Sequence, residues 1–217
     1  MGFAFDGDAD RCIAVDSEGR EINGDKIVYI LAEGMKRRGE LKDDTVVTTV
    51  MSNAGLYRAL ERAGMRSQQT AVGDRFIYER IKQGGYSLGA EQSGHVIMSK
   101  YSVTGDGILT AIMLTEEVVS RGKTIAELGA PVVMLPQWTE NVRVTDKAVA
   151  DGGRVKKKLE QITASLGGRG RVLLRKSGTA PLIRVMVEAE SEEECRTLAR
   201  ELASVIRKEA GNEASSL

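Results

Sequence analysis

Apolar residues recur three or four positions apart in several stretches of the chain, which is the spacing of one buried helix face. In the clearest case, Asn23-Gly24-Asp25 precedes such a stretch and Gly39 follows it, as expected at the two ends of a helix. The pattern predicts helices at residues 26–38, 52–63, 76–83, 104–121, 153–166 and 192–208. In the fourth of these, the side chains expected on or near the buried stripe are Ile108, Ala111, Ile112, Leu114 and Thr115.

Short runs rich in β-branched residues alternate with these helices. Residues 45–50 are β-branched throughout, which is typical of a strand buried on both faces. Further strands are expected at residues 11–15, 67–72, 86–90, 95–98, 139–144, 171–175 and 182–188. Alternating strands and helices predict a layered α/β domain, and the β-α-β-β-α order near the C-terminus predicts a small α+β domain. Gly129, Pro131 and Pro136 cluster between the two, and we interpret residues 128–137 as a linker.

The composition narrows the class of protein. The chain has 31 basic and 31 acidic residues, so no strong field favours nucleic acid or an anionic membrane as a partner. No apolar run approaches the roughly 20 residues of a membrane span, and no signal peptide opens the chain. Cys12 and Cys195 lie far apart and the chain has one histidine, so we expect neither a disulfide framework nor a thiol metal site. A cytoplasmic location is therefore expected.

Three aspartates alternate with small residues in the segment Phe5-Asp6-Gly7-Asp8-Ala9-Asp10-Arg11. In an extended segment, residues two apart point the same way, so these carboxylates are expected to converge. Close carboxylates repel unless a cation lies among them, and oxygen ligands favour Mg²⁺ or Ca²⁺. A calcium EF-hand loop would need Gly and Glu where Arg11 and Ser17 stand, which leaves Mg²⁺. The alternative is an acidic surface turn.

Two further segments carry groups suited to a phosphorylated sugar. Glu91-Gln92-Ser93-Gly94-His95 offers a carboxylate, a hydroxyl and the only imidazole, and sugar hydroxyls need such acceptors and donors on a rigid turn. A structural hydrogen-bonding role is the alternative for the histidine. Arg175-Lys176-Ser177-Gly178-Thr179, followed by Arg184, can cradle a phosphate with backbone N–H groups and guanidinium groups, the alternative being a polar hairpin.

Gly73-Asp74-Arg75 lies directly before the third predicted helix. It could orient a ligand at the helix N-terminus, or it could be a cap with a surface ion pair of little energetic value. The order of the motifs is more specific than any one of them. The chain contains, in sequence, FDGDADR, VGDR, GAEQSGH, TGDG and RKSGTAPLIRVMVE. In this order they resemble the α-D-phosphohexomutase superfamily, and most closely its bacterial phosphoglucosamine mutases, over residues 2–190 by motif and over the final helix by position.

The resemblance implies a domain organisation. Members of that superfamily have four domains, which carry in turn a phosphoserine loop, a Mg²⁺ loop, a sugar loop and a phosphate loop. Residues 1–20 would be the end of the second domain, residues 21–133 the third, α/β/α domain, and residues 137–217 the fourth, a small α+β (TBP-like) domain. An N-terminal half would then be missing from this chain and would be one of its partners, while a homodimer is left open.

The resemblance also implies a reaction and a set of residues. The family reaction interconverts glucosamine 6-phosphate and glucosamine 1-phosphate through an enzyme phosphoserine and a 1,6-bisphosphate, on the route to UDP-N-acetylglucosamine and cell-wall precursors. Arg11 would support the transferring phosphoryl group. By similarity, the Mg²⁺ ligands would be Asp6, Asp8 and Asp10, the sugar ligands Glu91, Ser93 and His95, and the ligands of the phosphate not being transferred Arg175, Ser177, Gly178, Thr179 and Arg184.

The sequence departs from the family pattern in two ways. The serine loop, T-A-S-H-N-P in the family, is absent from these 217 residues, so we name no nucleophile and expect the chain to be inactive alone. In the phosphate loop, Ala180 stands where the family usually has Glu, and Lys176 where it often has Pro. The alternatives are a portion of a phosphomannomutase or phosphoglucomutase, against which Gln92 and the VGDR turn argue, and a non-catalytic phosphosugar-binding fragment.

Overall fold

Strand β4 (Thr45–Thr49) lies between two apolar layers, and all five of its residues are buried. Val46 belongs to the large core that also contains Leu56 and Leu60, whereas Val47 packs with Ile77 on the opposite face. Neighbouring strand residues point to opposite faces of a sheet, so one β-branched run serves both layers. This confirms a strand buried on both sides.

The computed structural model describes residues 1–178 and 180–211, which form two compact units, one of Met1–Met134 and one that begins at Leu135. In the first unit, the sheet order is β5 (Arg66–Thr70), β4, β6 (Leu88–Ala90) and β7 (Val96–Met98). Strand β4 pairs in parallel with β5 and β6, and β7 is antiparallel to β6. The antiparallel step places the turn between β6 and β7 at the end of the sheet where β4 and β5 finish.

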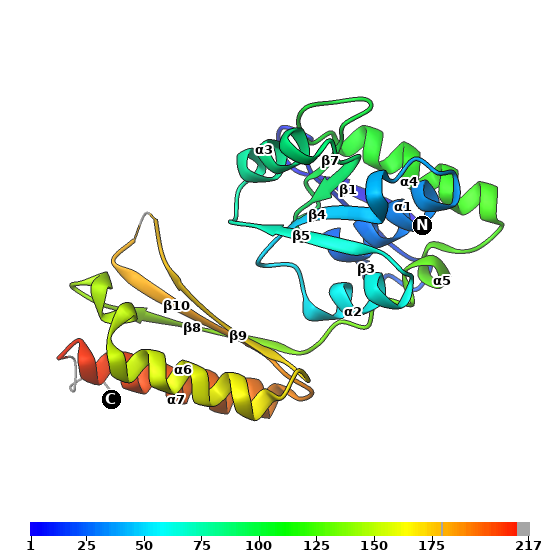
Figure 1. Ribbon diagram of the computed structural model, residues 1–217. Helices are drawn as coiled ribbons and strands as arrows, with labels where there is room; N and C mark the ends of the chain where they lie inside the picture. Colours follow the sequence, from blue (N-terminus) through cyan, green and yellow to red (C-terminus); the bar gives the residue numbers. More distant parts are fainter. Residues whose placement is uncertain (179, 212–217) are drawn as a thin grey trace. The chain divides into compact units, whose positions relative to one another are not determined.

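Helices cover both faces of this sheet, so the unit has the predicted α/β/α layers (Figure 1). Helix α3 (Asp74–Gly84) covers one face. The opposite face is covered by α1 (Gly24–Arg37), α2 (Ala54–Arg62), α4 (Gly107–Arg121) and the short α5 (Ile125–Gly129). Asn23 and Asn53 cap α1 and α2 through their side chains, as the sequence predicts.

A second, antiparallel sheet of the first unit flanks the aspartate segment. Its order is β1 (Gly2–Phe5), β2 (Cys12–Val15) and β3 (Glu21–Ile22). The sequence predicted β2 but not β1 or β3, and β3, with two residues, is too short to show an alternating pattern. A 3₁₀ turn, η1 (Lys42–Asp44), precedes β4 and was also not predicted.

The second unit is an antiparallel sheet in the order β8 (Gln137–Arg143), β10 (Leu182–Glu188) and β9 (Arg171–Lys176). Helices α6 (Gly153–Leu166) and α7 (Glu192–Glu209) lie side by side on one face of it (Figure 1). Alternate residues of β10, such as Ile183 and Val185, enter that core. The predicted β-α-β-β-α order is confirmed, with one 3₁₀ turn, η2 (Lys147–Asp151), added before α6.

The expected buried stripe of α4 is wrong in part. Ile108 and Ile112 have exposed fractions of 57% and 60%, and the buried residues of α4 include Thr110 and Glu117. The helix is turned so that a carboxylate enters the interior, and an apolar-periodicity argument cannot anticipate that. No helix in the described part of the chain combines the length and the apolar character that a membrane span requires.

Glu117 is buried because Gly34 leaves space for its side chain and Arg38 neutralises its charge. Its exposed fraction is 1%, and its Oε1 forms an ion pair with Arg38, which follows α1. A Cβ atom on Gly34 would lie 2.0 Å from the Glu117 carboxylate, so a larger residue at this point of α1 would displace that carboxylate. Arg38 also contacts Glu40, at 2.7 Å, on the solvent side. The α1–α4 contact therefore depends on one buried charge and its partner.

We expect Arg38→Met to lower the free energy of unfolding by about 3 kcal/mol, because it leaves the Glu117 carboxylate buried without a counter-charge. Urea unfolding followed by circular dichroism measures this. The matched control is Arg37→Met, which removes an exposed arginine from the preceding position and should change stability by less than about 0.5 kcal/mol. The double variant Arg38→Met/Glu117→Met should recover part of the loss. Equal stability of the two single variants would contradict this account.

Candidate functional site

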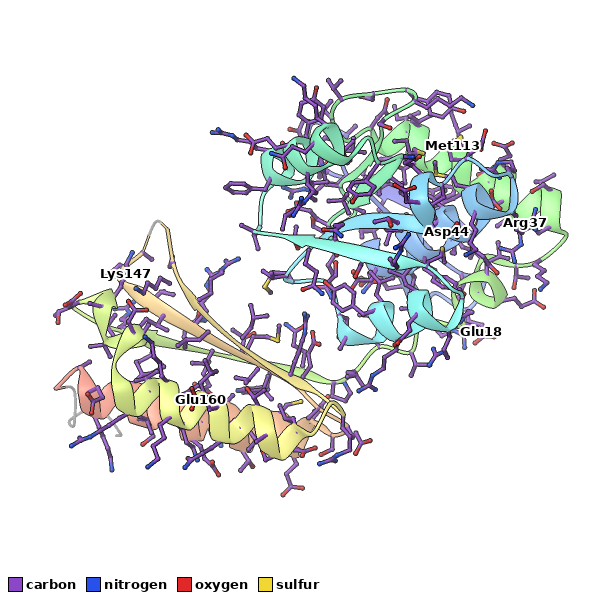
Figure 2. All side chains as sticks on the ribbon, viewed as in Figure 1. Glu18, Arg37, Asp44, Met113, Lys147 and Glu160 are labelled. Atoms are coloured by element: carbon purple, nitrogen blue, oxygen red, sulfur yellow. The ribbon has the colours of Figure 1, made fainter. Side chains whose placement is uncertain are left out.

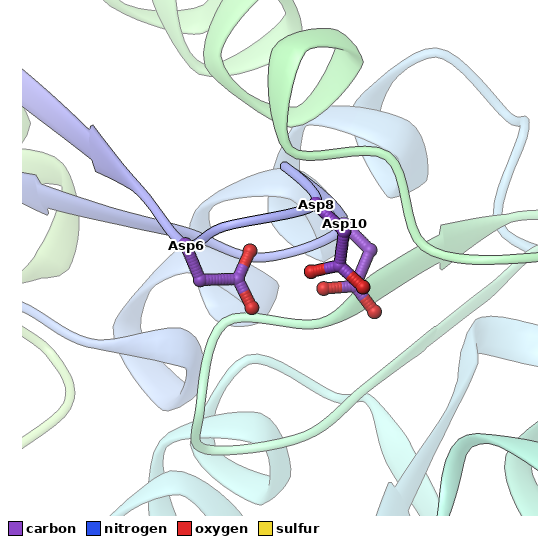
Figure 3. A group of neighbouring side chains, drawn as sticks. All are labelled: Asp6, Asp8 and Asp10. Carbon is purple, nitrogen blue, oxygen red and sulfur yellow. The ribbon is translucent and has the colours of Figure 1, made fainter.

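The three aspartates of the first unit converge, as Figure 3 shows. One ligand oxygen from each of Asp6, Asp8 and Asp10 can be chosen so that all lie within 4.8 Å of one another. Asp6 and Asp8 are exposed and Asp10 is half-buried, so the cluster opens to solvent on one side. This is a suitable arrangement for a hard divalent cation that keeps part of its water shell.

The convergence does not come from an extended segment, and that part of the prediction is wrong. The chain turns after β1, where the N–H of Ala9 donates to the carbonyl of Asp6 at 3.2 Å. Ala9 has φ of 58°, in the left-handed region that a non-glycine residue seldom adopts. The backbone N–H of Arg11 closes the turn by donating to Asp6 Oδ1 at 3.2 Å. A turn thus replaces the strand, and the alternation of aspartates with small residues still brings the carboxylates together.

The electrostatics of the cluster favour a bound cation. Burial, together with the charges of Asp8 and Asp6, raises the pKa of Asp10 above its ordinary value. Asp10 Oδ1 is buried and has no hydrogen-bond partner among the described residues. The guanidinium of Arg11 lies at the edge, with Nε 3.7 Å from Asp6 Oδ2 and 4.0 Å from Asp10 Oδ1. One arginine against three carboxylates leaves net negative charge that a divalent cation would offset.

The segment with Glu91, Ser93 and His95 lies directly against the aspartate turn. The N–H of Cys12 donates to the carbonyl of Gly94 at 3.1 Å, and Arg11 forms an isolated antiparallel bridge with His95. A Cβ atom on Gly94 would lie 2.2 Å from the carbonyl oxygen of Cys12, so the two backbones touch. Burial raises the pKa of the Cys12 thiol to about 11, which keeps this sulfur protonated behind the turn.

The polar groups of this segment point in different directions. Ser93 is exposed, and Glu91 is half-buried with its Oε1 accepting from the N–H of Gly73 at 3.0 Å. The Gly73-Asp74-Arg75 turn is therefore joined to the predicted sugar segment, while Arg75 pairs with Glu79 on the surface at 2.8 Å. The imidazole of His95 is 2% exposed and lies beneath the aspartate turn, with Nε2 3.5 Å from Asp10 Oδ2.

Residues at the start of α1 support the sugar segment, and the sequence prediction missed this role. The N–H of Gly24 donates to the carbonyl of Gln92 at 3.0 Å, and a Cβ on Gly24 would lie 2.1 Å from the carbonyl oxygen of Glu91. Asp25 Oδ2 accepts from the side chain of Gln92 at 3.2 Å and from the N–H of Asn53 at 2.8 Å. Asp25 is 1% exposed, so Gln92 anchors the segment inward. The sequence feature that could have indicated this role is the acidic residue Asp25 in the first turn of α1.

In the second unit, the loop between β9 and β10 carries the predicted phosphate ligands. Arg175 and Arg184 are direct cross-strand partners, so two guanidinium groups stand on the same face of the sheet. Like charges in that position repel, and an anion between them would remove the repulsion. Ser177 is buried and its Oγ accepts from the N–H of Ala180 at 3.1 Å, while Gly178 is exposed. Thr179 lies outside the described residues.

Two contacts from η2 hold this loop in place, and neither was predicted. Lys147, labelled in Figure 2, donates from Nζ to the carbonyl of Ser177 at 2.6 Å. Lys176 Nζ contacts Asp151 Oδ2 at 2.5 Å. Lys147 therefore extends from η2 to the β9–β10 loop, and Lys176 extends from the end of β9 to η2. Lys176 thus has a definite structural partner at the position where the family often has proline.

Two family models match this chain. The model described as phosphoglucomutase/phosphomannomutase, alpha/beta/alpha domain III, matches residues 23–133. The model described as phosphoglucomutase/phosphomannomutase, C-terminal domain, matches residues 140–205. The two matches fall in the first and second units respectively.

The chain is also similar to named proteins of that family. It is 52% identical to a phosphoglucosamine mutase of Geobacillus thermodenitrificans and 50% identical to that of Bacillus subtilis, over 98% of this chain and 48% of each relative. It therefore spans about half the length of these curated relatives. A crystal structure of Aspergillus fumigatus N-acetylphosphoglucosamine mutase, in complex with GlcNAc-6P and magnesium, has a TM-score of 0.79. That likeness, at 22% identity over 96% of this chain and 48% of the other, shows the fold alone.

We expect Asp8→Asn to weaken divalent-cation binding by more than about tenfold, because it removes one of three converging carboxylates without changing the turn. Isothermal titration with Mg²⁺ and electron paramagnetic resonance of Mn²⁺ measure the affinity. The control is Asp43→Asn, an exposed aspartate whose partner is Lys42. Mg²⁺ should raise the melting temperature of the unmodified chain and of the control, but not that of Asp8→Asn. Unchanged binding by Asp8→Asn would show that the cluster is only an acidic turn.

Proposed function

The chain belongs to the phosphoglucomutase/phosphomannomutase family, and on this premise we propose that it is the metal- and phosphosugar-binding part of a phosphoglucosamine mutase. The reaction of the whole enzyme is the interconversion of glucosamine 6-phosphate and glucosamine 1-phosphate. The observation that carries the proposal is the cluster of three carboxylates within 4.8 Å, joined by backbone contacts to the segment that holds Glu91 and Ser93. The 52% identity to a phosphoglucosamine mutase supports this substrate class.

The residues of the aspartate turn fit a magnesium ion. Asp6, Asp8 and Asp10 supply hard oxygen ligands, and the buried, unpartnered Oδ1 of Asp10 is satisfied when a cation lies beside it. Bound there, Mg²⁺ would stabilise negative charge on the phosphoryl group that is being transferred. Arg11, half-exposed at the edge of the cluster, is placed to contact the oxygens of the same group.

The sugar would be held beside that turn. Glu91 has one carboxylate oxygen on Gly73 and the other available to accept from sugar hydroxyls, and Ser93 presents an exposed hydroxyl. Their supports, Gly24 and Asp25, belong to the start of a buried helix, so the segment is held rigidly in the geometry that positioning requires. A rigid acceptor pair favours one orientation of the ring over others.

The loop of the second unit would bind the phosphate that is not transferred. Arg175 and Arg184 supply two guanidinium groups on one sheet face, and we include Ser177, Gly178 and Thr179 in the same site. The distal phosphate contributes binding and orientation and not chemistry, which is how remote binding energy lowers a barrier. His95, which we assign with Glu91 and Ser93 to the sugar site, completes the proposed site residues.

In the proposed reaction, the free hydroxyl oxygen at C1 of glucosamine 6-phosphate loses its proton and takes the phosphoryl group of a phosphoserine, whose oxygen is the leaving group, and the resulting 1,6-bisphosphate returns the phosphoryl group at C6 to the serine. The residues of the first unit would bind the sugar, orient the reacting oxygen and offset charge on the moving group, and those of the second unit would bind a phosphate. A serine in the family's T-A-S-H-N-P context does not occur in the 217 residues. The proposal therefore assigns binding and charge stabilisation to this chain and no nucleophile.

We expect the chain to bind glucosamine 6-phosphate in the presence of Mg²⁺, and Arg184→Met to weaken that binding by roughly 10- to 100-fold, since a hydrogen bond to a charged group is worth about 1.5–3 kcal/mol. Isothermal titration measures both affinities. Arg154→Met is the control, because Arg154 is an exposed arginine of α6 paired with Glu209. Competition with mannose 6-phosphate and glucose 6-phosphate tests the hexose, and tighter binding of either would transfer the proposal to that sibling activity.

We expect the 217-residue chain alone to give no turnover of glucosamine 6-phosphate, because no phosphoryl donor of the family type is present in it. The assay follows glucosamine 1-phosphate by phosphorus NMR, with a glucosamine 1,6-bisphosphate primer and Mg²⁺. Binding without turnover agrees with the proposal. Formation of product at a rate above the enzyme-free reaction would refute the proposal that this chain supplies no nucleophile.

A further inference from the structure

The buried imidazole of His95 lies between the aspartate turn and a second turn, Thr104-Gly105-Asp106-Gly107, to which no role has been given so far. We propose that His95 and this second turn form a support that holds Asp10 in its metal-binding position, so that His95 is a positioning residue for the cation. The inference rests on the metal site of the proposed function. It concerns residues that do not contact the cation themselves.

The first argument is the position of the imidazole. His95 is 2% exposed, and the N–H of Gly105 donates to its Nε2 at 3.2 Å. The same nitrogen lies 3.5 Å from Asp10 Oδ2. One ring atom therefore faces the backbone of the second turn and the carboxylate of the aspartate turn. A carboxylate with a rigid ring against one oxygen has fewer rotamers available, and its other oxygen, Oδ1, is the buried atom without a partner.

The second argument is the close contact of the two turns. The N–H of Gly107 donates to the carbonyl of Ala9 at 2.9 Å. A Cβ atom on Gly107 would lie 2.6 Å from the carbonyl oxygen of Arg11, so no larger residue fits without displacing the backbone. This contact fixes the carbonyl of Ala9, the residue whose left-handed φ of 58° allows the aspartates to converge.

The third argument is the space at Gly105. A Cβ atom there would lie 2.5 Å from His95 Nε2 and 2.8 Å from the carbonyl oxygen of Asp10. Glycine at this position lets the second turn approach the imidazole and the aspartate backbone together. His95 is itself paired through its backbone with Arg11, directly after Asp10. The imidazole and the second turn thus hold the side chain and the backbone of one metal ligand.

A purely structural role for His95 makes a different prediction. His95 Nδ1 is buried and has no hydrogen-bond partner among the described residues, and an unsatisfied polar atom costs stability. Replacement of the ring by phenylalanine keeps a planar ring and removes that atom. If His95 only filled space, His95→Phe would leave metal affinity unchanged. If it positions Asp10, the affinity falls, because the hydrogen bond from Gly105 that fixes the ring against the carboxylate is lost.

The test measures Mn²⁺ affinity by electron paramagnetic resonance, and melting temperature without metal, for three variants of the full chain. We expect His95→Phe to weaken Mn²⁺ binding by roughly 10- to 100-fold, the usual effect of removing a group that orients a metal ligand. His95→Gln should remain within about threefold of the unmodified chain, because its amide can accept from Gly105 and donate to Asp10. Thr48→Val removes a buried hydroxyl elsewhere in the first unit and should leave the affinity unchanged.

The outcomes separate this inference from the proposed function. If the unmodified chain binds no Mn²⁺, the metal site and the inference both fail. If the unmodified chain binds Mn²⁺ and His95→Phe binds it equally well, the metal site stands and the inference alone is overturned. A drop in melting temperature of His95→Phe with unchanged affinity has the same meaning, since it shows only a structural role.

A measurement on the unmodified chain covers the case in which His95→Phe does not fold. His95 is the only histidine, so ¹⁵N NMR at fixed pH gives one pair of imidazole signals. We expect the Nε2 signal to shift when Mg²⁺ saturates the site, because the charge and orientation of the Asp10 carboxylate beside it change. An Nε2 signal that is identical with and without saturating Mg²⁺ would overturn the proposed contact.

Discussion

For the proposed cation to bind, three carboxylates must be held close together, and the first unit does this largely with backbone contacts. The aspartate turn, with Cys12 directly after it, lies against Gly94 on one side and against Gly105 and Gly107 on the other, where a Cβ atom on each glycine would be 2.2–2.8 Å from a backbone carbonyl oxygen of this segment. Backbone contacts of this kind are stiff, because neither partner has a rotamer to change. Repulsion among the aspartates is therefore resisted by the fold, and the site is organised without the ion. The buried oxygen of Asp10 is what remains unsatisfied.

Much of the architecture could be predicted from local patterns. Helix α6 and strand β10 have the bounds that periodicity predicted, and the glycines and capping residues marked most helix ends, because these signals depend only on neighbouring residues. The orientation of α4 could not be predicted, because it depends on the ion pair between Glu117 and Arg38, which are far apart in the sequence. The shape of the aspartate turn could not be predicted for a related reason. Its shape is imposed by a bond from Gly107 to Ala9, which no local pattern contains.

Prediction of the candidate site was limited in the same way. The alternating aspartates and the arginines of the predicted phosphate loop were selected as candidates because carboxylate and guanidinium side chains can be recognised directly in a sequence. The residues that hold those side chains were missed. Gln92 was weighed as a sign of sugar preference, and the structure gives it a buried partner, Asp25. Lys176 was counted as a departure from the family pattern, and the structure pairs it with Asp151, so the loop keeps an anchor to η2 without the proline.

The hydrogen bond between Cys12 and Gly94 has a mechanical consequence. It unites the aspartate turn and the Glu91–His95 segment into one body, since the two are also linked through the bridge between Arg11 and His95. Neither segment can move relative to the other without breaking this backbone pairing. In the proposed reaction, the sugar would therefore have to release its hydroxyl contacts and rotate, while the body formed by these two segments stays fixed.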